Sequence, residues 1–430
     1  MFSVRWPLIV TGLLISLTSA AQPLTDSFLK KLFKDQKDSL LQHVLDHPET
    51  YRYQLIYTQI NRDTKNNPSF TNYYYQFDSL RYFNPASTVK LPLALLSLEK
   101  LHTLEKYGVN MYTPVLIDSS YSGQTIMHQD STSENGLPSI AHFIKKVFLI
   151  SDNVAYNRMY EFLGQQTINR RLHEMGYPDL RITRRFVRMK EDENRRTNSM
   201  RFIKPEGNLL YEQPPAYNMD KFNFSHINKM GIAHYANDSL IQSPIDFTTA
   251  NNVTILHLQQ LLQSALFPES VTPSKRWRLT EEDYKFLYRF LSQYPSETDF
   301  PKYDSSVYFD SYVKFFFRNA KQRIPPYVRV FNKVGWAYGC MTDVSYIVDF
   351  KHRVEFMLTA TIYVNSDGVM NDDKYDYDTI GYPFFYKLGQ FFYQYELKRP
   401  KKNPPDLSRF KMEYKKQLND GRPAIKEADN

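Results

Sequence analysis

The 430-residue sequence is poor in cysteine and glycine. Its single cysteine, Cys340, excludes both a disulfide framework and a multi-cysteine zinc site, and leaves a free thiol that we expect to be buried. Fourteen glycines exclude a collagen-like chain, and the lack of a sustained heptad repeat excludes a coiled coil. After residue 21 no apolar run reaches the roughly 17–25 residues that a membrane-spanning helix needs. These absences leave a globular protein without a transmembrane segment.

Basic residues are in excess, but they are unevenly spread. The chain holds 54 Lys and Arg against 46 Asp and Glu, a formal net charge of +8. Residues 398–430 hold ten basic against five acidic residues, so this tail alone carries +5. With Arg5 set aside, the body from residue 21 to 397 carries only +2. The tail is therefore expected either to contact an anionic surface or to be a solvated end.

The first residues, MFSVRWPLIVTGLLISLTSAA, have the pattern of a secretory signal peptide. Arg5 supplies the positive charge, Trp6–Leu17 is a 12-residue apolar stretch, and small residues follow it. We expect residues 1–20 to be removed, with cleavage after Ala20 or Ala21, and the protein to be periplasmic or secreted. Export makes nucleic acid an improbable partner, so we expect a small-molecule or cell-wall-derived substrate and a monomer.

Strand patterns occur near both ends of the chain, and helical patterns occur between them. Strands are predicted at 51–61, 71–77, 328–332, 345–350 and 354–364, and helices at 26–47, 84–104, 138–174, 246–263 and 383–397. This order predicts an α/β (α+β) fold, in which both chain ends form one antiparallel sheet and a helical domain is inserted between them.

The predicted organisation has three parts. The signal peptide spans 1–20, one large domain spans 21–397, and the basic tail spans 398–430. Within the domain we expect the sheet part at about 21–85 and 324–397 and the helical part at about 86–323. Two stretches, 181–237 and 273–323, have the character of long insertions. The first is rich in Arg and reads as a long loop, and loops of that length are usually functional or mobile.

The first candidate for chemistry is Ser87-Thr88-Val89-Lys90, at the start of a predicted helix. A serine in a first helical turn lies near free backbone N–H groups, and a lysine three residues on projects from the same face. A serine hydroxyl needs an adjacent base to become a nucleophile, and a desolvated lysine can supply one. The four residues alone are equally typical of a capped helix with a solvated lysine.

Two further motifs lie downstream. Ser151-Asp152-Asn153 follows an apolar run and precedes a helix, where such residues are also ordinary helix caps. Functionally, Ser151 could relay a proton and Asn153 could hold a substrate carbonyl. Lys333-Val334-Gly335 follows a predicted strand, where the glycine lets a substrate approach closely and the lysine offers positive charge. The simpler interpretation of this motif is an edge strand with an exposed lysine.

Together the three motifs match the S-x-x-K, S-D-N and K-x-G set of class A β-lactamases and penicillin-binding proteins. Their surroundings, FNPASTVKLPLALL, ISDNVAYNRMYEFLG and NKVGWAYGCMTDVSYIV, strengthen the resemblance. The chain thus resembles the penicillin-recognising serine hydrolases, and within them the class A β-lactamase-like branch, over roughly residues 51–397.

The resemblance implies a role for each motif residue. Ser87 would be the acylated nucleophile, Lys90 its base, and Ser151 the proton relay. The residues expected to bind substrate are Asn153, Lys333, Gly335 and Trp336, where the backbone N–H groups of Ser87 and Trp336 would form the oxyanion hole.

The sequence also departs from the family pattern. Val334 stands where the family usually has Thr or Ser, and no Arg follows Lys333 within ten residues. The family's deacylating Glu usually lies in an E-x-x-L-N segment, which is missing from RITRRFVRMKEDENRRTN. The nearest candidates for that base are Glu191 and Glu193, and both are equally well explained as solvated loop acids.

Three functions remain open from the sequence. The first is acyl transfer from a β-lactam or a peptidoglycan-type amide to a serine, followed by hydrolysis. The second is a penicillin-binding D,D-peptidase-like enzyme, or a related amidase or esterase, with slow deacylation. The third is a catalytically silent relative that binds cell-wall fragments or a partner. The ten histidines show no metal-binding spacing and no Gly-rich loop follows a strand, so no metal or cofactor is expected.

Overall fold

The computed structural model describes residues 23–119, 123–319, 323–414 and 421–427. The predicted signal peptide therefore lies outside the described residues. None of the helices in these ranges has the length and apolarity that a bilayer span requires. The helices are α1 (Ser27–Lys34), α2 (Ser39–Asp46), α3 (Pro48–Tyr51), α4 (Lys90–His102), α5 (Ile140–Leu149), α6 (Asn153–Leu163), α7 (Gln165–Glu174), α8 (Glu191–Arg195), α9 (Ile255–Leu266), α10 (Glu281–Ser292) and α11 (Tyr382–Lys398).

The central element is a five-stranded antiparallel sheet with the order β10-β11-β12-β1-β2. Two strands come from the N-terminal part of the chain and three from the C-terminal part, with α4–α10 between them in sequence. This confirms the predicted α/β (α+β) fold. The strands of this sheet are β1 (Gln54–Arg62), β2 (Pro68–Tyr75), β10 (Val328–Ala337), β11 (Cys340–Asp349) and β12 (Val354–Tyr363).

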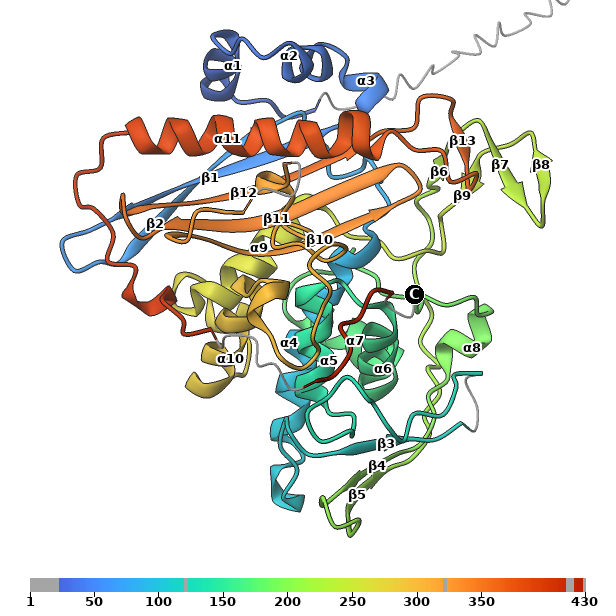
Figure 1. The fold of residues 1–430 in the computed structure, drawn as a ribbon. Coiled ribbons are helices and arrows are strands. Elements are labelled where there is room, and N and C mark those ends of the chain that lie inside the picture. Colours follow the sequence, from blue (N-terminus) through green and yellow to red (C-terminus); the bar gives the residue numbers. More distant parts are fainter. Residues whose placement is uncertain (1–22, 120–122, 320–322, 415–420, 428–430) are drawn as a thin grey trace, which may run out of the picture.

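Helices cover both faces of the sheet. In Figure 1, α11 and α1–α3 lie on one side, and α9 and the other long helices lie on the opposite side. β1, β10, β11 and β12 are largely buried because each face of the sheet packs on its own apolar cluster, whereas the edge strand β2 is partly exposed. The α11 side is rich in aromatic contacts, for example Tyr57 stacked on Phe392 with ring centroids 4.6 Å apart. Much of the high aromatic content therefore fills this core.

Several element predictions need correction. The helix predicted over 138–174 is three helices, α5, α6 and α7, and the helix predicted over 246–263 starts only at Ile255, with α9. The helix predicted over 26–47 is two helices, because α1 ends at Lys34 and a new helix starts at Asp38, which caps α2 by accepting from the backbone N–H groups of Leu40 and Leu41. The stretch 181–237, predicted as a long loop, contains α8 and short strands that pair within small sheets. The strands inside this stretch are β4 (Met200–Ile203), β5 (Leu209–Gln213), β6 (Lys229–Met230) and β7 (Ala233–Ala236). Their partners from outside it are β3 (Val115–Ile117), β8 (Ser239–Ile241), β9 (Ile245–Asp246) and β13 (Val369–Met370).

Part of the basic tail packs on the body of the protein. Leu407 and Phe410 are buried, and Phe410 lies against Phe267 and Tyr346 with ring centroids 5.3 and 4.9 Å away. Arg409 forms an ion pair with Glu269 at 2.7 Å. Cys340 is a free, buried thiol, as expected, and burial raises its pKa to about 11.

Candidate active site

Ser87 lies in a short 3-10 turn, η1 (Ala86–Val89), that leads directly into α4. The turn is fixed by its neighbours: Asn84 Oδ1 accepts from the backbone N–H of Ala86, and Pro85 O accepts from both the backbone and the hydroxyl of Thr88. Ser87 is half-buried. Hydrogen bonds of the residues on either side therefore hold the turn at Ser87, and its side chain is not fully covered.

The third motif lies against this turn. Gly335 is inside β10, which extends to Ala337, beyond the end predicted from the sequence. A Cβ added at Gly335 would lie 2.5 Å from Pro85 O and 2.8 Å from Ser87 N, closer than side chains approach backbone atoms. Only glycine allows this strand to touch the Ser87 turn, and the contact brings Trp336 next to Ser87.

The second motif supplies the hydroxyl on which two lysines converge. Lys90 Nζ donates to the carbonyl oxygen of Ser151, to Asn153 Oδ1 at 2.7 Å and to Ser151 Oγ at 3.3 Å. Lys333 Nζ donates to Ser151 Oγ at 2.9 Å and to the carbonyl oxygen of Val334 at 2.8 Å. The structure thus joins residues from three distant parts of the sequence. The hydrogen bonds of Lys90 go to Ser151 and Asn153 rather than to the Ser87 hydroxyl.

The backbone of Ser151 is strained. Its φ is +67°, a left-handed conformation that costs a non-glycine residue roughly 1–2 kcal/mol. This conformation lies between the end of α5 and the start of α6, where Asp152 Oδ1 caps α6 by accepting from the backbone N–H of Ala155 at 2.7 Å. Such strain is typical of a functional site, where the surroundings hold an otherwise unfavourable geometry.

The side chains of both lysines are buried. Burial lowers the pKa of Lys90 to about 7, against the opposing attraction of Asp152. The rings of Phe186 and Tyr156 contribute to this burial, since they lie 5.1 and 6.0 Å from the amine. Burial and then the charge of Lys90 lower the pKa of Lys333 well below its ordinary value. Near neutral pH, Lys90 can therefore be present as the free amine that general-base chemistry requires.

Two cavities meet at Ser87. The first, which we call the arginine cavity, has a volume of about 820 Å³ and is lined by Ser87, Asn153, Trp336, Arg184 and Arg188 among others. The second, the tyrosine cavity, has a volume of about 260 Å³. Its lining consists of Ser87, Ile150, Ser151, Asn153, Tyr308, Tyr312 and Trp336. Ser87, Asn153 and Trp336 line both cavities, whereas Ser151 lines only the tyrosine cavity.

The two candidate deacylation bases lie outside these cavities. Glu191 is exposed and pairs with Arg195 at 3.1 Å. Glu193 accepts at 2.6 Å from the backbone N–H of Lys190 in a capping box at the start of α8. Among the described residues that line the arginine and tyrosine cavities, none is Asp or Glu. The lining thus offers no carboxylate beside Ser87 to activate a water molecule.

Val334, the departure in the third motif, lies on the far side of β10. Its side chain is fully buried in the apolar cluster beneath α11 and lines neither cavity. Strand alternation explains this position, because Lys333 and Gly335 face the site and the residue between them faces away. A hydroxyl at position 334 would therefore point into the core and not at a ligand.

A network of buried polar side chains connects β10 to β11 and to Lys314. Asn332 Nδ2 donates to Asp343 Oδ1 at 2.9 Å, and Lys314 Nζ donates to Asn332 Oδ1 at 2.7 Å. Burial raises the pKa of Asp343 to about 7 and lowers that of Lys314 to about 7. The network fixes the strand that carries Lys333 to the segment that supplies Tyr308 and Tyr312. No sequence motif pointed to these residues.

An ion pair positions the wall of the arginine cavity. Arg185 and Glu161 form a pair whose side chains are both completely buried, and Glu161 also accepts from the backbone N–H of Asn198. Arg185 also donates to the carbonyl oxygens of Glu193, at 3.1 Å, and of Arg196, at 2.6 Å. Because Glu161 belongs to α6, the pair anchors the 184–196 segment to the helix that begins at Asn153.

We expect Arg185→Met to lower the free energy of unfolding by roughly 3–5 kcal/mol, because Glu161 would remain as an unpaired buried charge. The measurement is urea denaturation followed by tryptophan fluorescence. Arg170→Met is the control, since the Arg170–Asp220 pair is largely exposed and its loss costs at most about 1 kcal/mol. Equal effects of the two substitutions would contradict the anchoring role.

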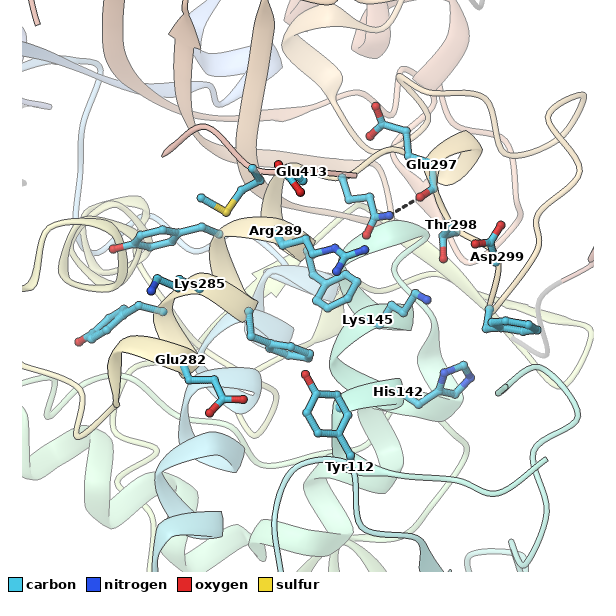
Figure 2. Close-up of a pocket in the computed structure, with 18 of the residues that line it drawn as sticks. Tyr112, His142, Lys145, Glu282, Lys285, Arg289, Glu297, Thr298, Asp299 and Glu413 are labelled. Atoms are coloured by element: carbon cyan, nitrogen blue, oxygen red, sulfur yellow. Dashed lines mark hydrogen bonds between the residues drawn. The ribbon is translucent and has the colours of Figure 1, made fainter. Parts of the chain in front are cut away.

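A third cavity, of about 1400 Å³, lies away from the motifs, between α5, α10 and residues 408–413. Figure 2 shows that its lining mixes both signs of charge, with Lys145 and Arg289 beside Glu282 and Asp299. None of the three motifs contributes a residue to it. Within the described part of the chain, no group of three or more His, Cys, Asp or Glu side chains could hold a metal ion.

Comparisons with known proteins give one family match and a set of similar solved structures. Residues 50–206 match the model of the Beta-lactamase enzyme family. One similar solved structure is a β-lactamase from Streptosporangium roseum, with 14% identity, a match over 84% of this chain and 99% of that chain, and a TM-score of 0.45. Another is a β-lactamase from Burkholderia ambifaria, with 15% identity, a match over 83% of this chain and 99% of that chain, and a TM-score of 0.44. No curated protein matches the chain. The family match confirms, over residues 50–206, the resemblance to the β-lactamase-like serine enzymes, and this stretch includes Ser87, Lys90, Ser151 and Asn153.

Proposed function

We propose that the protein is an exported serine enzyme that transfers the acyl group of a β-lactam or peptidoglycan-type amide to Ser87 and releases it slowly. One observation carries this proposal: Lys90 and Lys333 both donate to the Ser151 hydroxyl, in a cavity that Ser87 also lines. These are the groups that acyl transfer from an amide requires, namely a nucleophile, a base and a proton relay.

In the proposed reaction the Ser87 oxygen attacks the amide carbonyl carbon, and its proton passes to the Lys90 amine by way of the Ser151 hydroxyl, which Lys90 contacts. The backbone N–H groups of Ser87 and Trp336 bind the oxygen that becomes negative, which is commonly the largest catalytic contribution. The C–N bond then breaks, and Ser151 donates a proton to the leaving nitrogen and recovers one from Lys90. Lys333 keeps the Ser151 hydroxyl in place, and Asn153 positions the substrate.

Slow release follows from what surrounds Ser87. Hydrolysis of the ester needs a water molecule activated by a base. Because no described residue lining the arginine or tyrosine cavity is Asp or Glu, the ester is expected to persist. This favours a penicillin-binding, peptidase-like enzyme over an efficient β-lactamase.

The test is incubation with a penicillin, followed by intact-protein mass and by measurement of free hydrolysed penicillin over time. The proposal expects one adduct per chain that persists after unbound penicillin is removed. Rapid loss of the adduct with continuous product formation would instead identify a β-lactamase. If no adduct forms, the acyl-transfer proposal fails and a binding role or another substrate takes its place.

Export is part of the proposal and has its own check. N-terminal sequencing of the protein secreted or carried to the periplasm by a bacterial host should start at Ala21 or Gln22. A chain that retains Met1 would contradict the signal peptide.

The acylation rate is expected to rise with pH around neutrality. The pKa of Lys90 is about 7, so the free amine amounts to roughly a tenth at pH 6 and nine-tenths at pH 8. As the amine is the base, the second-order rate constant for acylation should increase about tenfold between these values and then level off. Stopped-flow measurement with a chromogenic β-lactam gives the profile. A rate that is flat from pH 6 to 8 would exclude the amine as the base.

A further inference from the structure

Two arginines of the insertion line the cavity beside Ser87 without a carboxylate partner. Arg184 Nη2 donates to Thr249 Oγ1 at 3.2 Å, and Arg188 Nη2 donates to Asn237 Oδ1 at 3.3 Å. Both arginines are exposed, and neither forms an ion pair among the described residues. Arg185 between them is different, because it is buried and neutralised by Glu161.

The rest of the arginine cavity leaves these charges uncompensated. Its other polar side chains are mainly neutral amides such as Asn84 and Asn251, its apolar wall is aromatic, and none of its described lining residues is acidic. A cavity lined by positive side chains and no negative ones attracts an anion. Arginine binds carboxylates through two parallel hydrogen bonds. Two arginines without a carboxylate partner among the described residues therefore line the space beside Ser87.

The placement of Ser151 decides which half of the substrate occupies this space. In the proposed reaction Ser151 protonates the leaving nitrogen, and Ser151 lines the tyrosine cavity but not the arginine cavity. The leaving group is thus directed into the tyrosine cavity. The acyl group, which stays bonded to Ser87, is directed into the arginine cavity, toward Arg184 and Arg188.

We propose that the acyl half of the substrate carries a carboxylate that Arg184 and Arg188 bind. This inference rests on the proposed acyl transfer at Ser87 and narrows it to amides with an anionic acyl side chain. It also gives the Arg-rich insertion a role in substrate selection.

The test compares two penicillins that differ in one group. One carries a phenylacetyl side chain, and the other carries the same side chain with a carboxylate on its α-carbon. The full-length protein should be acylated about tenfold faster by the carboxylated probe, a typical effect of hydrogen bonds to a charged group. Because the arginines are exposed, this ratio should shrink as ionic strength rises from about 0.05 to about 0.5 M.

The double variant Arg184→Gln/Arg188→Gln should bring the ratio of the two rates to about one. Arg278→Gln is the matched control, since Arg278 is exposed and lines neither the arginine nor the tyrosine cavity. Its ratio should equal that of the unmodified protein.

Equal rates for both probes in the unmodified protein, or a preference that survives the double variant, would overturn the inference. Failure of both probes to form any adduct would instead show that the proposed acyl transfer is wrong, and the inference would fall with it.

Discussion

Replacing Gly335 with alanine is expected to reduce the acylation rate at Ser87 by about 100-fold or more. The new methyl group would lie 2.5 Å from Pro85 O and 2.8 Å from Ser87 N, and both are backbone atoms that cannot turn away. Either β10 or the Ser87 turn must shift, which separates Ser87 from the N–H group of Trp336. Displacement of about 1 Å at a reacting centre commonly costs about 100-fold in rate. The rate is measured with a chromogenic β-lactam, after the folded fraction has been determined by urea denaturation.

Gly389→Ala is the matched control for this prediction. A Cβ at Gly389 would lie 2.3 Å from Phe316 O, an equally severe backbone clash, but Gly389 is on α11, across the sheet from the arginine cavity. It should lower the free energy of unfolding by about 1–3 kcal/mol while the folded protein keeps its acylation rate. If both variants lose acylation only in proportion to their unfolded fraction, then Gly335 has no specific role at the site.

Replacing Lys90 with methionine is expected to lower the acylation rate by about 10²–10⁴-fold, the usual contribution of a positioned general base. The substitution also removes the hydrogen bonds to Ser151 and Asn153 that hold the second motif in place. Stability should change far less, by under about 2 kcal/mol. The loss of a buried amine with a pKa near 7 is favourable, whereas the acceptors left without a donor are unfavourable.

The chain offers a close control on the same helix. Lys100 is half-buried, its pKa is also lowered to about 7, and its amine donates to Gln213 Oε1 at 2.7 Å. It lines neither the arginine nor the tyrosine cavity. Lys100→Met should therefore leave the acylation rate of the folded protein within about threefold of the original. A loss as large as that of Lys90→Met would mean that any lysine of α4 with a lowered pKa is needed, which would remove the argument for Lys90 as the base.

The sheet and the convergence of the motifs were largely predictable from the sequence. Segments rich in Tyr and β-branched residues at both chain ends predicted which strands form the sheet, because such side chains favour strands. The left-handed Ser151 and the contact between Gly335 and Pro85 were not predictable, since both depend on how distant segments meet. The break before α2 was signalled by Asp38, which is a strong helix-capping residue.

The surroundings of Ser87 were much less predictable. The positive charge of the stretch that holds Arg184 and Arg188 was evident from the sequence. Only the structure shows that Arg185 pairs with Glu161 while Arg184 and Arg188 line the arginine cavity without an acidic partner among the described residues. Tyr308 and Tyr312 come from an insertion without any motif. The acidic residues closest to the expected base position, Glu191 and Glu193, turn to Arg195 and to the start of α8. The position of each of these side chains depends on tertiary contacts, which sequence motifs do not reveal.

The account depends most directly on Ser87 as the acylated atom. The measurement is digestion of the protein after reaction with a penicillin, followed by fragment mass spectrometry that locates the added mass, with Ser87→Ala treated in parallel. The account predicts that the added mass lies on Ser87 and that the Ser87→Ala protein gains none. Added mass on Ser151 or on any other residue, or equal labelling of the Ser87→Ala protein, would contradict it.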